Sequence, residues 1–301
     1  MTTSRSLLVS IAAWMALAMC AGAQAPTAFD SNKAWEHLRQ QVAIGPRPSG
    51  TAANVKNRDY IKAEMAKLGI KTTEQPVEGS TPLGPVKMVN IIATIPGKST
   101  DRIVLASHFD TKLFRDMRFV GASDGASSTA ALIELARVIK ARGSLPFTIE
   151  LLFLDGEEAV IEWQGNDNTY GSRHYVDAAR KSGSLKSLRA LVLLDMIGDR
   201  NLTIRRESNS TRWLTDIVWG AAKKLGHRAF MDEETTVEDD HIPFLKAGVP
   251  SVDIIDLDYP QWHTPDDDLN HVSAGSLQAV GDVLLAAIPD IEGRLLTSDA
   301  K

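Results

Sequence analysis

From about residue 88 onward, the chain alternates short apolar runs with longer amphipathic runs. The apolar runs are MVNIIATI, RIVLASHFD, FTIELLFLD, LRALVLLDMIG and PSVDIIDL. They do not alternate apolar with polar residues, which is the pattern of strands in a sheet that is covered on both faces. The runs between them have the length and the periodicity of helices. Strands that alternate with helices along the chain predict an α/β sandwich.

The other segments predict where helices and turns lie. The helical runs are residues 129–141, 168–181, 211–226, 239–248 and 273–288. Before them we expect a helix near 31–43 with Ser31 as its N-cap, followed by a turn at 45–50. A second helix should follow, with Ile61, Met65 and Leu68 on one face, and residues 79–86 should form a loop. The sequence contains no internal repeat, low-complexity tract or convincing linker, so it predicts one domain over residues 26–301.

The N-terminal segment has the pattern of a secretory signal. Arg5 precedes the apolar run LLVSIAAWMALAM, and Ala21-Gly22-Ala23 supplies a small-residue cleavage site. We therefore expect a signal peptide over residues 1–23 and a secreted or periplasmic protein. The apolar run is short for a transmembrane helix, so we expect no stable membrane span after cleavage; a retained N-terminal anchor is the alternative.

Cysteine usage and charge limit the chemistry. Cys20 is the only cysteine and lies inside the predicted signal, so the mature chain can form no disulfide, thiol nucleophile or Cys-based zinc site. A secreted protein without disulfides suits a bacterial periplasm or exterior. The net charge of −5 argues against nucleic acid and against an anionic membrane surface as partners. We expect a monomer.

Many charged residues follow the predicted strands directly. In open α/β sheets, sites form beyond the carboxyl ends of the strands. The residues concerned are His108, Asp110, Asp155, Glu157, Glu158 and Asp195, with Asp124 before a helix and Asp239, Asp240, His241 and His263 later in the chain. So many acids at one edge need a metal ion or shared protons to offset their repulsion. Histidine with carboxylates, and no thiolate, is the ligand set of catalytic zinc.

Each of these residues also has an ordinary structural interpretation. A pair of adjacent glutamates is usually solvated surface, and a lone His263 in a loop is usually a surface group. Asp124 could be an N-cap, Asp195 could bond a loop amide, and His108 could be a core histidine. The site hypothesis depends on all of them lying at one edge of one sheet. Because neighbouring residues point in different directions, one of Glu157 and Glu158 can bind the metal while the other serves as general base and acid.

Six of these motifs resemble a known family. HFD, GASDGA, DGEE, LLDMIG, DDHIPF and WHTPDD occur in this order in zinc-dependent exopeptidase-like proteins, which include secreted aminopeptidases and animal-type glutaminyl-peptide cyclotransferases. The resemblance covers roughly residues 30–290. It implies a zinc-exopeptidase-like (phosphorylase/hydrolase-like) fold: a three-layer α/β sandwich with a mixed, mostly parallel central sheet.

Further segments are similar to those of the cyclotransferases. These are SHFDTK, FLDGEEAVIEWQGNDNTYGSRHY, EDDHIPFLKAGVP and the Trp262-His263 pair. The resemblance implies one zinc per chain, held by Asp124, Glu158 and His263, with Glu157 as the proton shuttle. It also implies that Asp195 and Asp239 form a hydrogen-bonded network with Glu157, and that Trp163 and Trp262 line the substrate pocket.

Two features depart from the animal enzymes. Asp253 stands where they carry a histidine, which changes the proton network and the electrostatics of the pocket that we expect it to help form. The disulfide that they often have near the SHFD strand is impossible here, because the mature chain lacks cysteine.

The activity implied by the resemblance is cyclisation of N-terminal glutamine to pyroglutamate with release of ammonia, acting on peptides or small proteins. The alternative is a secreted two-zinc aminopeptidase, in which His108 and Asp195 hold a second zinc, Asp124 bridges, and Glu157 activates a water. A third interpretation is a binding module without metal on the same fold. A metal count of one, two or none separates the three.

Overall fold

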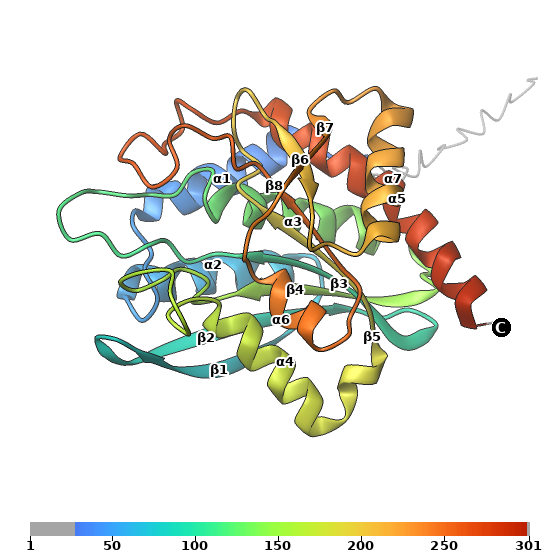
Figure 1. The fold of residues 1–301 in the computed structure, drawn as a ribbon, viewed down its shortest axis with the longest axis horizontal. Coiled ribbons are helices and arrows are strands. Elements are labelled where there is room, and N and C mark those ends of the chain that lie inside the picture. The colour runs from blue at the N-terminus through green and yellow to red at the C-terminus, as the bar shows by residue number, and fades with distance from the viewer. Residues whose placement is uncertain (1–27, 300–301) are drawn as a thin grey trace, which may run out of the picture.

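The central element of the computed structural model, which describes residues 28–299, is a six-stranded sheet (Figure 1). Its order is β1 (Lys71–Thr81), β2 (Gly84–Ile95), β4 (Phe147–Leu154), β3 (Ser99–His108), β5 (Leu188–Asp195) and β8 (Ser251–Ile255). Strands β3, β4, β5 and β8 pair in parallel, whereas β1 and β2 are antiparallel to their neighbours. The signal peptide predicted for residues 1–23 lies outside the described residues.

Helices cover both faces of this sheet (Figure 1). One face packs against α1 (Ser31–Ile44), α2 (Ala52–Lys67), α3 (Ala126–Ala141), α5 (Arg212–Leu225) and α7 (Ala274–Asp299). The other packs against α4 (Tyr170–Ser182) and α6 (His241–Lys246), with the short 3₁₀ helix η1 (Ser184–Ser187) nearby. The predicted three-layer α/β sandwich with a mixed, mostly parallel sheet is confirmed.

Strand β3 shows why the apolar runs are continuous. Its Ile103 and Leu105 belong to the core beneath the larger helical layer, while Val104 and Ala106 belong to the core under α4 and α6. All four are fully buried. Successive side chains of a strand point to opposite faces, so a sheet with two covered faces needs apolar residues at every position.

A second, two-stranded parallel sheet pairs β6 (Ile204–Glu207) with β7 (Phe230–Thr235). Strand β6 lies beside β8, and the segment after β7 leads to α6. This small sheet positions Asp239 and His241 next to the carboxyl ends of β5 and β8. The apolar content of β6 and β7 is too low to have predicted them from sequence.

Two local predictions were wrong. The N-cap of α1 is Asp30 and not Ser31, because the Asp30 carboxylate accepts hydrogen bonds from the backbone N–H of Asn32 and Lys33. Residues 79–86 are not a loop; they contain the ends of β1 and β2, which form a long hairpin. Strand β1 is an edge strand with mostly exposed polar side chains, so its sequence lacks the apolar run of a buried strand.

Helix α7 is long and apolar enough to span a membrane by length and composition. Its apolar side chains, among them Leu277, Val280, Leu284 and Ile288, are instead buried against α1, α3 and α5. The core helix of a globular domain passes the same test of length and composition.

Candidate active site

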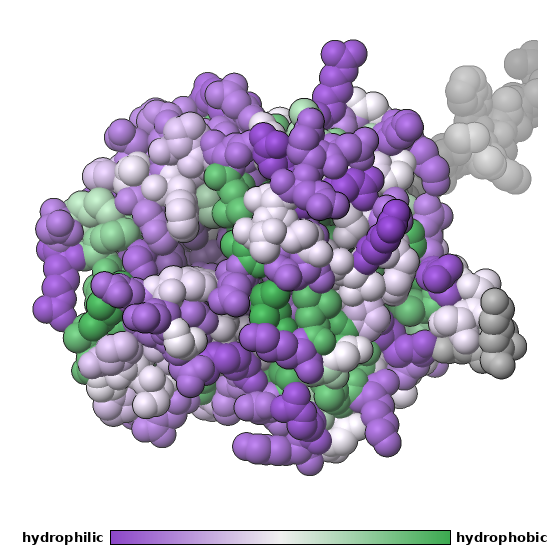
Figure 2. Space-filling view, viewed as in Figure 1, coloured by the Kyte–Doolittle hydropathy of each residue, from purple (hydrophilic) through white to green (hydrophobic). Residues whose placement is uncertain are grey.

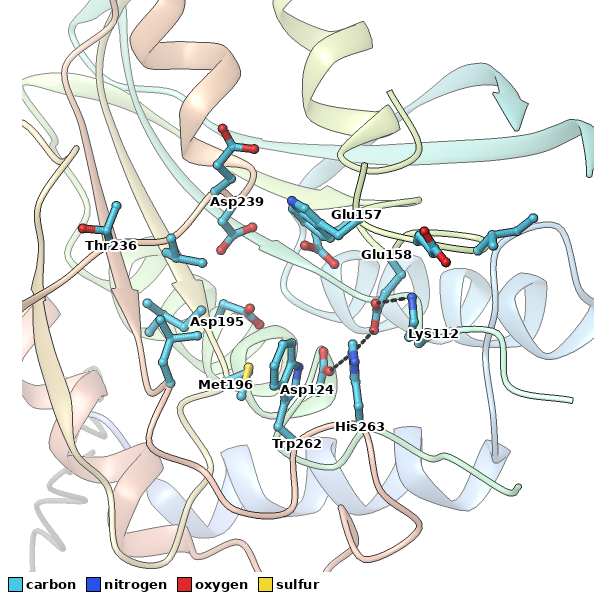
Figure 3. Close-up of a pocket in the computed structure, with 17 residues that line it drawn as sticks. Lys112, Asp124, Glu157, Glu158, Asp195, Met196, Thr236, Asp239, Trp262 and His263 are labelled. Atoms are coloured by element: carbon cyan, nitrogen blue, oxygen red, sulfur yellow. Dashed lines mark ion pairs between the residues drawn. The ribbon is translucent and has the colours of Figure 1, made fainter. Parts of the chain in front are cut away.

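The loops after β3, β4, β5 and β8 meet around a cavity of about 590 Å³ at the carboxyl ends of these strands. A hollow opens left of centre on the face shown in Figure 2, with hydrophobic surface beside it. Figure 3 shows the side chains that line the cavity. Among them are Asp124, Glu157, Glu158, Trp163, Asp195, Asp239, Trp262 and His263. Eight of the ten residues predicted to form the site therefore line one cavity.

Three of these side chains converge on a common point (Figure 3). His263 Nε2 lies 3.3 Å from Asp124 Oδ2 and 3.4 Å from Glu158 Oε1. Both carboxylate oxygens are buried and accept no hydrogen bond. Two ligand atoms that bind zinc at about 2.0–2.1 Å with tetrahedral geometry are about 3.3–3.4 Å apart. The three side chains therefore fit a zinc ion, which would also satisfy the two buried oxygens.

Hydrogen bonds to Asp267 fix the backbone of the loop that carries Asp124. The Asp267 carboxylate accepts from the backbone N–H of Ser123 at 2.7 Å and of Asp124 at 3.1 Å. Gly125 is the N-cap of α3, so Asp124 is not the cap that the alternative interpretation required. Gly125 has φ +83°, and a Cβ there would lie 2.7 Å from the Asp110 carbonyl oxygen. Only glycine allows this turn, which leaves the Asp124 carboxylate free to face the cavity.

The turn after β4 separates the adjacent glutamates. Gly156 has φ +78°, and the Asp110 carboxylate accepts hydrogen bonds from the backbone N–H of both Glu157 and Glu158. Figure 3 shows the Glu158 carboxylate directed at His263, whereas Asp195 and Asp239 lie across the cavity from it, beyond Glu157. The turn thus gives the two glutamates different partners.

His263 has a strained backbone and aromatic neighbours. Its φ is +54°, and among the described residues only two other non-glycine residues, Thr169 and Met196, also have positive φ. Met196 lines the cavity, so two of these strained residues are at the site. The imidazole stacks on Trp262 with ring centroids 4.4 Å apart. This packing fixes the orientation of Nε2 toward the two carboxylates.

His108 is buried below the cavity and contacts both Asp124, one of the three converging side chains, and Asp195. Its Nε2 lies 3.0 Å from Asp195 Oδ1 and 3.2 Å from Asp124 Oδ1. Burial alone would lower the pKa of His108, but Asp195, Asp110 and Asp124 raise it well above its usual value. A protonated His108 can donate to these carboxylates and offset their repulsion. His108, Asp124 and Asp195 also have the spacing of a second metal-binding group.

Glu157 lies in the most acidic part of the cavity. Burial raises the pKa of Glu157 well above its usual value, and Glu158, Asp239 and Asp240 raise it further, against the opposing effect of His108. A carboxyl group with a raised pKa can hold and release a proton near neutral pH. This environment agrees with the role predicted for Glu157.

The structure does not place Asp253 in the pocket wall, as the sequence had led us to expect. Asp253 lies within β8, is fully buried, and faces His241 and Asp239 behind the cavity. Strand β5 pairs with β8 and β6 lies beside it, and Asp253 is not among the residues that line the cavity. Sequence reasoning also gave His241 no role and missed Glu207, which contacts His241. No motif marks Glu207, because its burial depends on how β6 packs beside β8.

The tryptophans form the entrance. Trp163 is 40% exposed on the loop that follows Glu158, and Trp262 is 48% exposed beside His263. Both line the cavity. Large apolar side chains left exposed at the mouth of a cavity are typical of a surface that a ligand covers.

A zinc-compatible group of His and carboxylate side chains at the carboxyl edge of a three-layer α/β sandwich is typical of exopeptidase-like proteins. Residues 90–288 match the model of peptidase family M28, and the chain belongs to that family.

Several similar proteins are glutaminyl cyclases. The chain is 40% identical to a solved glutaminyl cyclase from an Acidobacteriales bacterium, with a TM-score of 0.86 over 89% of this chain and 97% of that chain. It is 32% identical to a glutaminyl-peptide cyclotransferase-like protein of Mus musculus, over 79% of this chain and 70% of the relative. A leucine aminopeptidase precursor from Bacteroides thetaiotaomicron is 30% identical, with a TM-score of 0.80, and covers 88% of this chain and 98% of its own. The predicted resemblance to glutaminyl-peptide cyclotransferases is confirmed.

Proposed function

We propose that this chain is a zinc-dependent glutaminyl-peptide cyclotransferase, which converts the N-terminal glutamine of peptides to pyroglutamate and releases ammonia. The observation that carries the proposal is the separation of tasks at the adjacent glutamates. Glu158 completes a three-ligand group with Asp124 and His263, while Glu157 stays outside that group with a raised pKa. The similarity to glutaminyl cyclases supports this assignment.

One zinc held by Asp124, Glu158 and His263 would supply Lewis acidity toward the side-chain carbonyl of the substrate. The α-amine of the same glutamine attacks that carbonyl carbon, so the protein needs no nucleophile. Glu157 accepts a proton from the amine and delivers it to the departing ammonia as the carbon–nitrogen bond breaks. Asp195 lies on the same side of the cavity and can accept a hydrogen bond from the substrate amine.

The cavity suits a substrate whose N-terminal side chain enters while the rest of the peptide stays outside. Trp163 and Trp262 form an apolar entrance that encloses the glutamine side chain and limits the access of water, while the rest of the peptide stays outside. The substrates are peptides or small proteins with N-terminal glutamine, without a role for nucleic acid. The catalytic domain spans residues 26–301 and acts as a monomer, and residues 1–23 direct it to the periplasm or exterior.

The test uses two substrates. The full-length protein with one equivalent of zinc is incubated with a glutamine-initiated peptide and, separately, with a leucine-initiated anilide. Ammonia release, with the matching mass loss from the peptide, is the expected result. Release of the aniline without loss of ammonia from the first peptide would overturn the proposal.

A two-zinc aminopeptidase is the second candidate, because His108, Asp124 and Asp195 form another possible metal group. In that case Glu157 would activate a water to hydrolyse the first peptide bond. Metal analysis of the purified protein distinguishes the two: one zinc per chain is expected for the cyclotransferase, and two for the aminopeptidase.

A further inference from the structure

A row of buried ionisable side chains continues behind Asp239, away from the cavity. His241 Nε2 lies 3.1 Å from Glu207 Oε2, and His241 Nδ1 lies 3.5 Å from Asp253 Oδ2. Asp253 in turn faces Asp239, which lines the cavity. His241 and Asp253 are fully buried, and Glu207 is 2% exposed. The row therefore leads from the substrate cavity into a region that neither substrate nor solvent reaches.

Glu207, the member of the row farthest from the cavity, fixes the orientation of the His241 ring. Its carboxylate accepts hydrogen bonds from the backbone and side-chain amides of Asn209 and from the backbone and hydroxyl of Ser210. Burial opposes ionisation, but the hydrogen bonds from His241, Asn209 and Ser210 lower the pKa of Glu207 to about 2. An ionised carboxylate can only accept, so His241 Nε2 carries a proton and Nδ1 is directed at Asp253.

The next members lack ordinary partners. His241 Nδ1, both Asp253 oxygens and Asp239 Oδ2 are buried and have no hydrogen bond of the usual kind. His241 Nδ1 lies 3.5 Å from Asp253 Oδ2, and one ligand atom from each of Asp239, His241 and Asp253 lies within 4.8 Å of the others, so protons between these groups would satisfy them together. Two adjacent buried carboxyl groups share a proton because they cannot both ionise. Burial raises the pKa of Asp253 well above its usual value, and Asp239, Asp195 and Glu207 raise it further.

We infer that Glu207 and His241 are positioning residues for the proposed cyclisation: His241 donates from Nε2 to Glu207 and from Nδ1 to Asp253, so that the single proton of the Asp253 carboxyl is donated to Asp239. Asp239 then remains an acceptor on the side of the cavity where Glu157 handles the proton. This inference rests on the proposed function and extends it to two residues that do not touch the substrate. The ring nitrogen that matters is Nδ1, since only Nδ1 contacts Asp253.

Two substitutions of His241 separate the two ring nitrogens. The amide of asparagine reaches the position of Nδ1, and that of glutamine reaches the position of Nε2. His241→Asn thus keeps a polar group against Asp253, while His241→Gln keeps one against Glu207. We expect His241→Gln to lower kcat about 10- to 100-fold, the range for outer partners of a catalytic group, with KM and zinc content unchanged. We expect His241→Asn to lower kcat by less than about threefold.

A merely structural role would give a different pattern. In that case kcat of both variants would fall together and in proportion to their melting temperatures, and this result would overturn the inference. An unchanged kcat in His241→Gln would also overturn it. A wild-type protein that cyclises no glutamine-initiated peptide would instead refute the proposed function, so the two failures are distinguishable.

A second pair of variants tests the inference if His241→Gln does not fold. Asp253→Asn keeps a neutral donor toward Asp239 and an acceptor toward His241, whereas Asp253→Leu has the same branching of its side chain and neither group. Activity within about threefold of wild type is expected for asparagine and a loss of at least about tenfold for leucine. Equal losses in these two variants would show that Asp253 does not act as a neutral donor, and the inference would fail.

Discussion

At the scale of single residues, the adjacent glutamates illustrate how a turn assigns different tasks. Glu158 faces His263 and Asp124, and Glu157 faces the acidic side of the cavity. The left-handed conformation at Gly156 and the hydrogen bonds to Asp110 produce this difference. The same two residue types in a regular strand would point to opposite faces of the sheet.

Substitution of each glutamate should therefore have a different effect. Glu157→Gln keeps the shape of the side chain but cannot accept a proton, so we expect a loss of turnover of at least about 100-fold with zinc retained. Glu158→Ala removes one of three protein ligands, so we expect loss of zinc together with activity. Metal analysis and ammonia release measure both effects. Full activity in Glu157→Gln would remove this residue from the proton transfer.

Asp256, which is not one of the proposed metal ligands, allows a test of how burial changes the pKa of a carboxyl group. Burial raises the pKa of Asp256 to about 7, and the charges of Asp199 and Asp258 add to this effect, against the backbone hydrogen bonds it accepts. An aspartate in the unfolded chain has a pKa of about 3.9. Between these values the folded state binds more protons, so the contribution of this group to stability is full below about pH 4 and is lost as pH rises through about 7.

Asp256→Asn cannot ionise, so the free energy of unfolding of the variant, relative to wild type, should increase between pH 5 and pH 8. Urea denaturation at the two pH values measures this difference, in which the titration of all other groups cancels. Asp216→Asn, at an exposed position on α5 where the carboxylate pairs with Arg206, is the control and is measured in the same way. A pH-independent difference for Asp256→Asn would contradict the assignment.

Most of the site could be predicted at this scale because the polar residues follow apolar strands directly. Asp124, Glu158 and His263 each belong to a short motif with a fixed place relative to a strand or helix. Asp253 could not be placed correctly, since the sequence does not show that it lies within β8, covered on both faces. Glu207 and His241 act through burial and through contacts with each other, and neither property is visible in a single sequence.

At the scale of elements, hydrogen bonds to Asp167 hold the loop between Glu158 and α4 in its conformation. The Asp167 carboxylate accepts hydrogen bonds from the backbone N–H of Val160, Ile161 and Glu162 and from the Tyr170 hydroxyl. One buried side chain thus holds the loop that carries Trp163 at the cavity entrance. A polar side chain that satisfies several backbone donors replaces regular secondary structure in such loops.

Asp167→Ala should therefore loosen the entrance. We expect KM for a glutamine-initiated peptide to rise about tenfold, because the loss of hydrogen bonds to three backbone groups costs about 1–3 kcal/mol, while zinc content stays unchanged. Asp177→Ala on α4 is the control, because Asp177 is exposed and pairs with Arg180 on the surface. Equal KM values for the two variants would show that the loop does not depend on Asp167.

The sequence predicts some helices and strands well and others poorly. The buried strands β3, β4, β5 and β8 and the helices between them follow the apolar pattern closely. The hairpin of β1 and β2 and the pair β6–β7 did not, because their strands lie at an edge or are short and mostly exposed. Strands of this kind form because a neighbouring strand offers hydrogen bonds, which is information that the local sequence lacks.

At the scale of the whole molecule, the three proposed metal ligands come from distant parts of the chain. Asp124 precedes α3, Glu158 follows β4, and His263 lies between β8 and α7. An ion that binds all three stabilises the folded state only, because the unfolded chain does not bring them together.

Removal of zinc should consequently lower the melting temperature. At a free zinc concentration about a thousandfold above its dissociation constant, binding contributes about 4 kcal/mol, which corresponds to roughly 10 °C for a domain of this size. A chelator should abolish this contribution, and added zinc should restore it. In Glu158→Ala the chelator should have no effect. A chelator-insensitive melting temperature in the wild-type protein would show that the three residues do not hold an ion.

The position of His263 in the chain also has a consequence for biosynthesis. Asp124 and Glu158 emerge from the ribosome long before it, and their loops remain without the third ligand until more than a hundred further residues have been made. A partly synthesised chain therefore cannot capture the ion in its final coordination. In the proposed site, binding of the ion would therefore come late in synthesis, after His263 has been made.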